Sequence, residues 1–239
     1  MIDKYYEQII HILGQIKDTQ NKKMREAASM VAEVIKADGI IYVFGCGHSH
    51  LIGLDCFYRA GGLANVSAML DTDLMLHNGA AKSSVMEKMH GIAESILERY
   101  CILEKDLLIV ISTSGKNAVP VEMAQAASKR GIKSIAVVSS AYFADKMENP
   151  MLSECSDMYI DNCVPHGDAV MEITGSEAKM GSVSTVAGSF ILQSILMEGA
   201  EQAAKEGARI PVYLSGNVEG GAEYNRILIT EYLPRIKHL

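Results

Sequence analysis

Residues 107–117, with the sequence LLIVISTSGKN, are the stretch that decides the fold of this chain. The five apolar residues 107–111 predict a strand that is buried on both faces. Three hydroxyl residues, a glycine, a lysine and an asparagine follow, and a helical pattern begins at Ala118. A strand that ends in a polar turn at a helix start leaves backbone N–H groups and the positive end of the helix dipole unpaired. The stretch therefore predicts an α/β unit with an anion site, and phosphate is the anion we expect.

Strands and helices alternate along most of the chain. The other expected strands are 40–44, 64–70, 134–138 and 158–160, and the expected helices are 2–37, 51–60, 83–100, 119–130 and 184–205. This alternation predicts an α/β fold, a three-layer sandwich in which helices cover both faces of a five-stranded parallel sheet. We expect a single domain over 1–239, with an N-terminal helical arm at 1–37, a core at 38–205 and a C-terminal extension at 206–239.

Composition excludes several classes of partner. The 239 residues carry a formal charge of −7 and no block of Lys and Arg, which argues against nucleic acid. No run of about 18 apolar residues occurs, so we expect no membrane span. The N-terminus lacks the pattern of a signal peptide, and the five cysteines are dispersed without a Cys-x-x-Cys pair. These features favour a protein of the reducing cytoplasm.

A second polar turn, Gly45-Cys46-Gly47-His48-Ser49-His50, follows the first expected strand. A dinucleotide-binding fingerprint needs a third glycine where His50 stands, so we expect no such cofactor. His48 and His50 lie two residues apart without a third ligand, so no metal is predicted. The turn is either an ordinary glycine turn or a second wall of the anion site, and we favour the second because such sheets bind ligands where their topology switches.

These two turns together resemble the sugar isomerase (SIS) domain family. The resemblance rests on Gly45-Cys46-Gly47-His48-Ser49 and on 109–117, continues through 123–131 and 135–137, and spans about residues 30 to 200. It implies a flavodoxin-like or Rossmann-like doubly wound sheet and a small phosphorylated sugar as ligand. It also implies a homodimer, or a dimer of dimers, whose sites are completed across the interface.

The resemblance also implies which residues bind the ligand. Ser112, Thr113, Ser114 and Asn117 would hold the phosphate, and Gly115 of the same turn is also expected to contact the ligand. The first turn would face the sugar with Gly47, His48 and Ser49. Lys116 is most simply a solvated lysine, and its role stays open.

Isomerisation of an aldose to a ketose needs a group that moves a proton between two carbons. Glu172 is the first candidate, because 170–176 with Ser184-Thr185 resembles the segment that carries the base in glucosamine-6-phosphate synthase; the alternative is a surface carboxylate. Glu87 is the second, near a glutamate position of N-acetylmuramic acid 6-phosphate etherase, although a helix face with Glu87 and His90 is often only solvated. His50 is the third.

One departure from the family pattern affects the chemistry. Phosphoheptose isomerase and the etherase place a glutamate about ten residues after the serine of the first turn, where this chain has Arg59, or Tyr58 if the register shifts by one residue. An arginine stays protonated and cannot be a general base, so Arg59 either binds an acidic group or forms a salt bridge. The leading hypothesis is a sugar-phosphate isomerase. A non-catalytic phosphosugar sensor and an etherase or lyase acting on an amino-sugar phosphate remain as alternatives.

Overall fold

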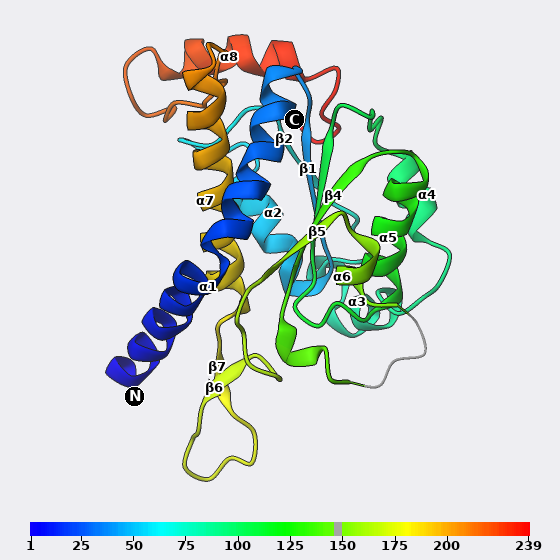
Figure 1. Ribbon diagram of the computed structural model, residues 1–239, viewed down its shortest axis with the longest axis vertical. Helices are drawn as coiled ribbons and strands as arrows, with labels where there is room; N and C mark the ends of the chain where they lie inside the picture. Colours follow the sequence, from blue (N-terminus) through cyan, green and yellow to red (C-terminus); the bar gives the residue numbers. More distant parts are fainter. Residues whose placement is uncertain (146–149) are drawn as a thin grey trace.

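The computed structural model describes residues 1–145 and 150–239. Its centre is a five-stranded sheet in which all strands are parallel and the order is β2-β1-β3-β4-β5 (Figure 1). The strands are β1 (Ile41–Gly45), β2 (Val66–Met69), β3 (Leu107–Ile111), β4 (Lys133–Val138) and β5 (Met158–Asp161). The predicted three-layer α/β fold is therefore confirmed.

Helices cover both faces of this sheet. One face packs against α1 (Ile2–Lys36), α2 (His50–Cys56) and α7 (Ser184–Lys205). The other packs against α4 (Ala93–Glu98), α5 (Ala118–Lys129), α6 (Leu152–Cys155) and α8 (Gly221–Tyr232). A short helix, α3 (Ala80–Met86), lies between β2 and α4 in the chain. Over the described residues, no helix combines the length and the apolar character needed to cross a membrane.

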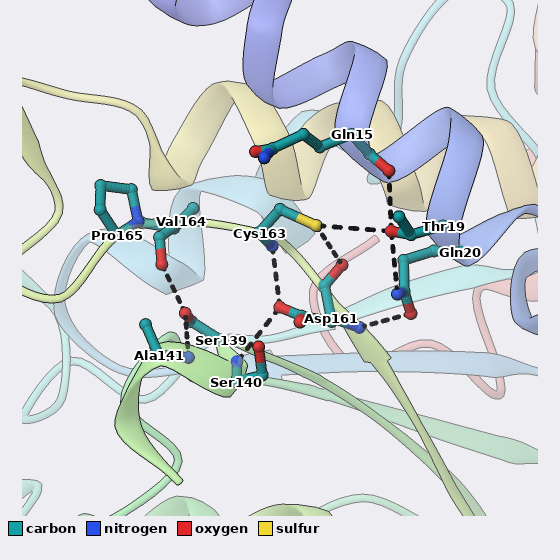
Figure 2. Close-up of a pocket in the computed structure, with 10 residues that line it drawn as sticks. All are labelled: Gln15, Thr19, Gln20, Ser139, Ser140, Ala141, Asp161, Cys163, Val164 and Pro165. Carbon is teal, nitrogen blue, oxygen red and sulfur yellow. Dashed lines mark hydrogen bonds between the residues drawn. The ribbon is translucent and has the colours of Figure 1, made fainter. Parts of the chain in front are cut away.

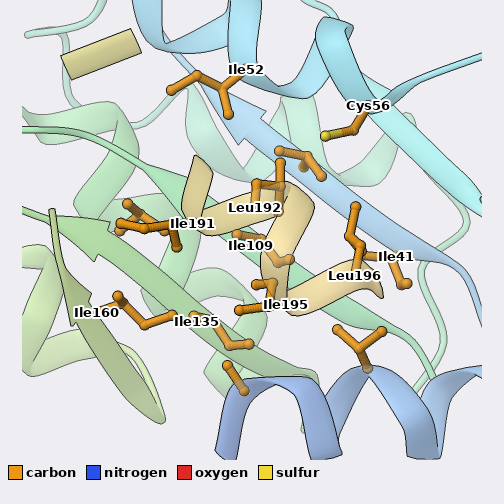
Figure 3. Packing of buried hydrophobic residues seen from close by; sticks show 14 of the residues in the cluster. Ile41, Ile52, Cys56, Ile109, Ile135, Ile160, Ile191, Leu192, Ile195 and Leu196 are labelled. Carbon is orange, nitrogen blue, oxygen red and sulfur yellow. The ribbon is translucent and has the colours of Figure 1, made fainter. Parts of the chain in front are cut away.

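The core consists of two apolar layers that share the sheet. Ile109 points to the layer with α1 and α7, while Leu108 and Val110 point to the layer with α5. Figure 3 shows Ile109 and Ile135 of the sheet against Ile195 of α7. All five residues of β3 are buried, and each such side chain stabilises the fold by about 1.5–3 kcal/mol relative to exposure. The strand that precedes residues 112–117 is therefore firmly anchored in the core.

The sheet topology places two turns side by side. β1 pairs with β3 so that Gly45 lies opposite Ile111, and these are the last residues of the two strands. After β1 the chain turns to α2 on one face, and after β3 it turns to α5 on the other. Parallel sheets with this strand order bind ligands in the crevice between such diverging connections.

Some elements differ from the sequence-based expectations. The helix expected at 83–100 is two helices, α3 and α4, separated at Gly91, whose φ is +85°. The carboxylate of Glu122 accepts hydrogen bonds at this break, from the backbone N–H of Gly91 (2.8 Å) and the ring of His90 (2.7 Å). No strand was expected between 160 and 184, but this region contains a hairpin of β6 (Ala169–Met171) and β7 (Met180–Ser182), and the C-terminal extension contains α8.

Candidate functional site

The turn after β3 is tight and largely buried. Ser112 is 8% exposed, and its hydroxyl accepts a hydrogen bond from the backbone N–H of Gly115 (3.3 Å). Gly115 has a φ of +64°, and an added Cβ would lie 3.2 Å from a methyl group of Val138. A side chain at this position would strain both the backbone and the packing, so the glycine is required here.

This turn presents unpaired hydrogen-bond donors. The backbone N–H groups of Thr113, Ser114 and Lys116 make no hydrogen bond within the residues that the structure describes. The turn leads directly into α5, with Asn117 as the N-terminal capping position. Free N–H groups, a serine hydroxyl and the start of a 12-residue helix together favour an anion.

Glu87 lies directly beside this turn. Its carboxylate accepts a hydrogen bond from the side-chain amide of Asn117 (2.8 Å), and its backbone carbonyl accepts one from Val119 (3.1 Å). Burial raises the pKa of the Glu87 carboxyl above its ordinary value, and nearby Lys88 lowers it by a smaller amount. A carboxyl group that holds its proton more strongly than usual, next to a turn that favours an anion, is suited to acid–base chemistry.

The turn after β1 forms the facing wall. Gly47 has a φ of +54°, and its backbone N–H donates to the carbonyl of Leu74 (2.8 Å). The ring of His50, 3% exposed, makes a short hydrogen bond through Nδ1 to the carbonyl of Gly47. Burial lowers the pKa of His50, so the neutral ring donates this bond. Ser49 is half-buried, and His48 is exposed.

A charged cluster borders the turn on the side of β4. The ammonium group of Lys116 is paired with Asp145 and lies 4.8 Å from the centre of the Tyr142 ring. His166 stacks on Tyr142 with ring centres 4.3 Å apart, and its Nε2 is 3.5 Å from Asp145. Lys116 is therefore anchored by an ion pair rather than free in solvent.

Two predicted residues lie away from the turn. Arg59 pairs with Asp55 one helical turn earlier, and Asp55 also accepts a hydrogen bond from Gln193 of α7 (3.1 Å). Of the two alternatives for Arg59, the structure shows the salt bridge. Glu172 is exposed and follows β6 in the hairpin that projects from the body (Figure 1). No hydrogen bond among the described residues joins it to the turn.

The structure adds a residue that sequence reasoning missed. Asn162 follows β5, is 1% exposed, and donates from its side-chain amide to the hydroxyl of Thr113 (3.4 Å). The side-chain carbonyl oxygen of Asn162, Oδ1, accepts a hydrogen bond from the backbone N–H of Val164 (3.1 Å). A polar pair, Asp161-Asn162, directly after a strand was the available signal, because the carboxyl ends of parallel strands share one edge of the sheet.

Comparisons with known proteins agree with this architecture. Residues 4–139 match the family model described as the SIS domain. A UPF0309 protein of Caldanaerobacter subterraneus subsp. tengcongensis is 40% identical over 246 residues, covering the whole of both chains. A UPF0309 protein of Brucella canis is 40% identical over 238 residues, which cover 99% of this chain and 98% of that one.

Two solved structures share the fold at low sequence identity. A phosphoheptose isomerase of Neisseria gonorrhoeae is 16% identical, with a TM-score of 0.57 over 84% of this chain and 97% of that one. The NanR protein of Vibrio vulnificus, complexed with ManNAc-6P, is 13% identical, with a TM-score of 0.50 over 99% of this chain and 70% of that one.

Proposed function

This chain belongs to the SIS domain family, and on that premise we propose that it binds a small phosphorylated sugar and acts on it as a sugar-phosphate isomerase. The observation that carries the proposal is the turn 112–117, which offers unpaired N–H groups at a topological switch point beside a half-buried carboxyl group. The phosphoheptose isomerase fold and the ManNAc-6P complex of a structural neighbour support the same ligand class.

The turn would bind the phosphate group. Backbone N–H groups of Thr113, Ser114 and Lys116 and the hydroxyl of Ser114 supply the donors, and α5 supplies the favourable end of a helix dipole. Gly47, His48 and Ser49 of the facing turn would contact the sugar. This arrangement lets a protein of net charge −7 bind an anion, because the positive potential is local.

Glu87 is the acid–base residue that we favour within one protomer. Its carboxylate would take a proton from the carbon beside the sugar carbonyl, leaving an enediolate, and return that proton to the former carbonyl carbon. A second proton would move from the neighbouring hydroxyl oxygen to the former carbonyl oxygen, which balances the isomerisation. A raised pKa suits both directions of this transfer, because the group must hold and release the same proton. His50 is fixed on the carbonyl of Gly47, so we assign it to positioning the first turn.

Other proposals concern the assembly and the alternatives. We propose a homodimer, or a dimer of dimers, in the cytoplasm, in which Glu172 of the projecting hairpin would serve a site on a second copy.

A non-catalytic sensor is favoured by one observation, Arg59 in an ion pair where related enzymes carry a glutamate. An etherase or lyase would use the same turn and Glu87 with a different leaving group.

Matched variants of three residues test the proposal. Purified protein is incubated with millimolar sugar monophosphates, and turnover, affinity and melting temperature are measured. Glu87→Gln keeps an acceptor for Asn117, and it should lower turnover by about 10²–10⁴-fold while affinity stays within a few-fold. The double variant Ser112→Ala with Ser114→Ala should lose binding itself.

Glu172→Gln is the control for the assignment of the base. If Glu172→Gln abolishes turnover and Glu87→Gln does not, Glu172 is the base. Binding that persists without turnover in the unmodified protein would establish the sensor. Neither turnover nor a melting shift with any sugar monophosphate would show that the proposed function is wrong.

A further inference from the structure

A cleft of about 420 Å³ lies between α1 and the loops that follow β4 and β5 (Figure 2). Helix α1 contributes Gln15, Thr19 and Gln20, the loop after β4 contributes Ser140, and the last residue of β5 is Asp161. Most of these side chains end in an amide, a hydroxyl or a carboxylate. We call this feature the α1 cleft, and the binding roles assigned to the two turns leave it unused.

The floor of the α1 cleft is held in place by hydrogen bonds. One carboxylate oxygen of Asp161, Oδ1, accepts from the backbone N–H groups of Ser140 (3.1 Å) and Cys163 (2.9 Å). The backbone N–H of Asp161 donates to the side-chain carbonyl of Gln20 (3.1 Å), which ties the loop to α1. The carboxylate is therefore oriented by the protein before any ligand arrives.

Two groups in the α1 cleft retain hydrogen-bonding capacity. The second carboxylate oxygen of Asp161, Oδ2, has no partner within the described part of the chain. The same is true of the side-chain amide of Gln15, which extends across the cleft towards Pro165 in Figure 2. A free carboxylate oxygen and a free amide that line the same cleft can bind hydroxyl or amino groups, because together they offer both an acceptor and a donor.

The α1 cleft adjoins the phosphate turn. Ser139 in its wall donates its backbone N–H to the carbonyl of Thr113 (2.8 Å), and Asn162 donates to the Thr113 hydroxyl. Neighbouring strands lie about 4.8 Å apart, so the ends of β4 and β5 are about 5–10 Å from the end of β3. A sugar of six or seven carbons whose phosphate sits on 112–117 has the length to reach this cleft.

Charge limits what the α1 cleft accepts. The α1 cleft is lined by the acidic residue Asp161, and no described Lys, Arg or His residue lines it. A second phosphate or a sugar carboxylate would meet like charge without a compensating cation, which is unfavourable where water is partly displaced. A hydroxyl or an ammonium group would meet a favourable partner instead.

Resting on the proposed function, we infer that the α1 cleft is the subsite for the hydroxyl- or amino-bearing part of a sugar monophosphate. Substrates would therefore be neutral or amino sugar monophosphates. Sugar bisphosphates and sugar phosphates with a carboxylate substituent would be disfavoured. This separates the ligand class from that of an enzyme acting on an acidic ether such as N-acetylmuramic acid 6-phosphate.

Titration calorimetry with four probes tests the inference: inorganic phosphate, fructose 6-phosphate, glucosamine 6-phosphate and fructose 1,6-bisphosphate. The unmodified protein should bind both monophosphates at least about 10-fold more tightly than inorganic phosphate, and the bisphosphate less tightly than the monophosphates. Gln15→Leu should weaken both sugar monophosphates by about 3–10-fold, the loss of one hydrogen bond, and leave inorganic phosphate unchanged. Asp161→Asn should weaken the binding of glucosamine 6-phosphate. It should also reduce the difference in affinity between the monophosphates and the bisphosphate.

Gln8→Leu is the matched control, because Gln8 is an exposed glutamine on the same helix outside the cleft. It should leave all four affinities unchanged. Suppose that inorganic phosphate binds in a Ser112-dependent way, while Gln15→Leu and Asp161→Asn change the affinity for no sugar phosphate. The proposed subsite in the α1 cleft is then wrong, and phosphate binding by residues 112–117 is supported. If no probe binds, the proposed function is overturned together with the subsite.

Discussion

At the scale of single residues, Glu87 connects the candidate site to the pH dependence of stability. Burial raises the pKa of its carboxyl group in the folded protein above the unfolded value. The protonated form therefore favours folding, a contribution present at low pH that is lost as pH rises through the folded pKa. Glu87→Gln removes the ionised form, so it should raise the melting temperature by roughly 1–3 °C at pH 8, with a smaller gain at pH 4.

Thermal melts across this pH range check the prediction. Glu172→Gln provides the control, since Glu172 is exposed and its neutralisation should change neither melting temperature. A Glu87→Gln protein that loses stability equally at both pH values would contradict the prediction. It would indicate that the hydrogen bond to Asn117, rather than burial of a charge, determines the contribution of Glu87 to stability.

At the scale of secondary-structure elements, the seam between α1 and α7 depends on one glycine. Gly199 of α7 faces α1 so closely that an added Cβ would lie 2.5 Å from a methyl group of Val31 and 2.7 Å from the carbonyl of Ala28. Such overlap forces the helices apart. Gly199→Ala should therefore destabilise the protein by about 1–3 kcal/mol and lower its melting temperature by about 2–10 °C.

Gly14 supplies a matched control on the other long helix. An added Cβ at Gly14 meets no atom within 4 Å, and the residue lies inside α1. Gly14→Ala should therefore stabilise the protein by about 0.5–1 kcal/mol through helix propensity alone. Equal effects of the two substitutions in calorimetric or thermal unfolding would contradict the close approach of α1 and α7.

At the scale of the whole molecule, the sequence predicts elements whose ends are marked locally. The bounds of β3 and α7 match the expected ones, because an apolar run or a helical pattern ends there at polar residues. The break at Gly91 was missed because Glu122, which accepts its N–H, belongs to α5. The helix α8 was missed because Leu228 and Tyr232 become a recognisable apolar face only when packed on the sheet.

In the candidate site, too, local features were predicted from the sequence and long-range contacts were not. The turn after β3 and its facing turn were predicted, because each is contiguous in sequence and follows a strand. The contact of Glu87 with Asn117 joins residues 30 positions apart, and the link between Gln20 and Asp161 joins residues 141 apart. Contacts of this length depend on how helices cross the carboxyl edge of the sheet, which no local pattern reports.

The exposed start of α1 bears on how the whole molecule assembles. The first turns of α1 project beyond the body (Figure 1), and they carry Ile2, Tyr6 and Ile10 with exposed fractions of 86%, 63% and 49%. Residues four apart share one face of a helix, so these side chains form an apolar stripe in solvent. We expect this stripe to be covered by a second copy in the proposed homodimer.

Analytical ultracentrifugation at micromolar concentration tests this expectation. The unmodified protein should have twice the chain mass of 25.9 kDa, or four times that mass for a dimer of dimers. The triple variant Ile2→Ser, Tyr6→Ser and Ile10→Ser should shift it towards the single-chain mass. Ile227→Ser with Leu233→Ser, which removes exposed apolar side chains in and just after α8, should leave the assembly intact. A single-chain mass for the unmodified protein would exclude the homodimer, whereas an intact dimer of the triple variant would place the interface away from α1.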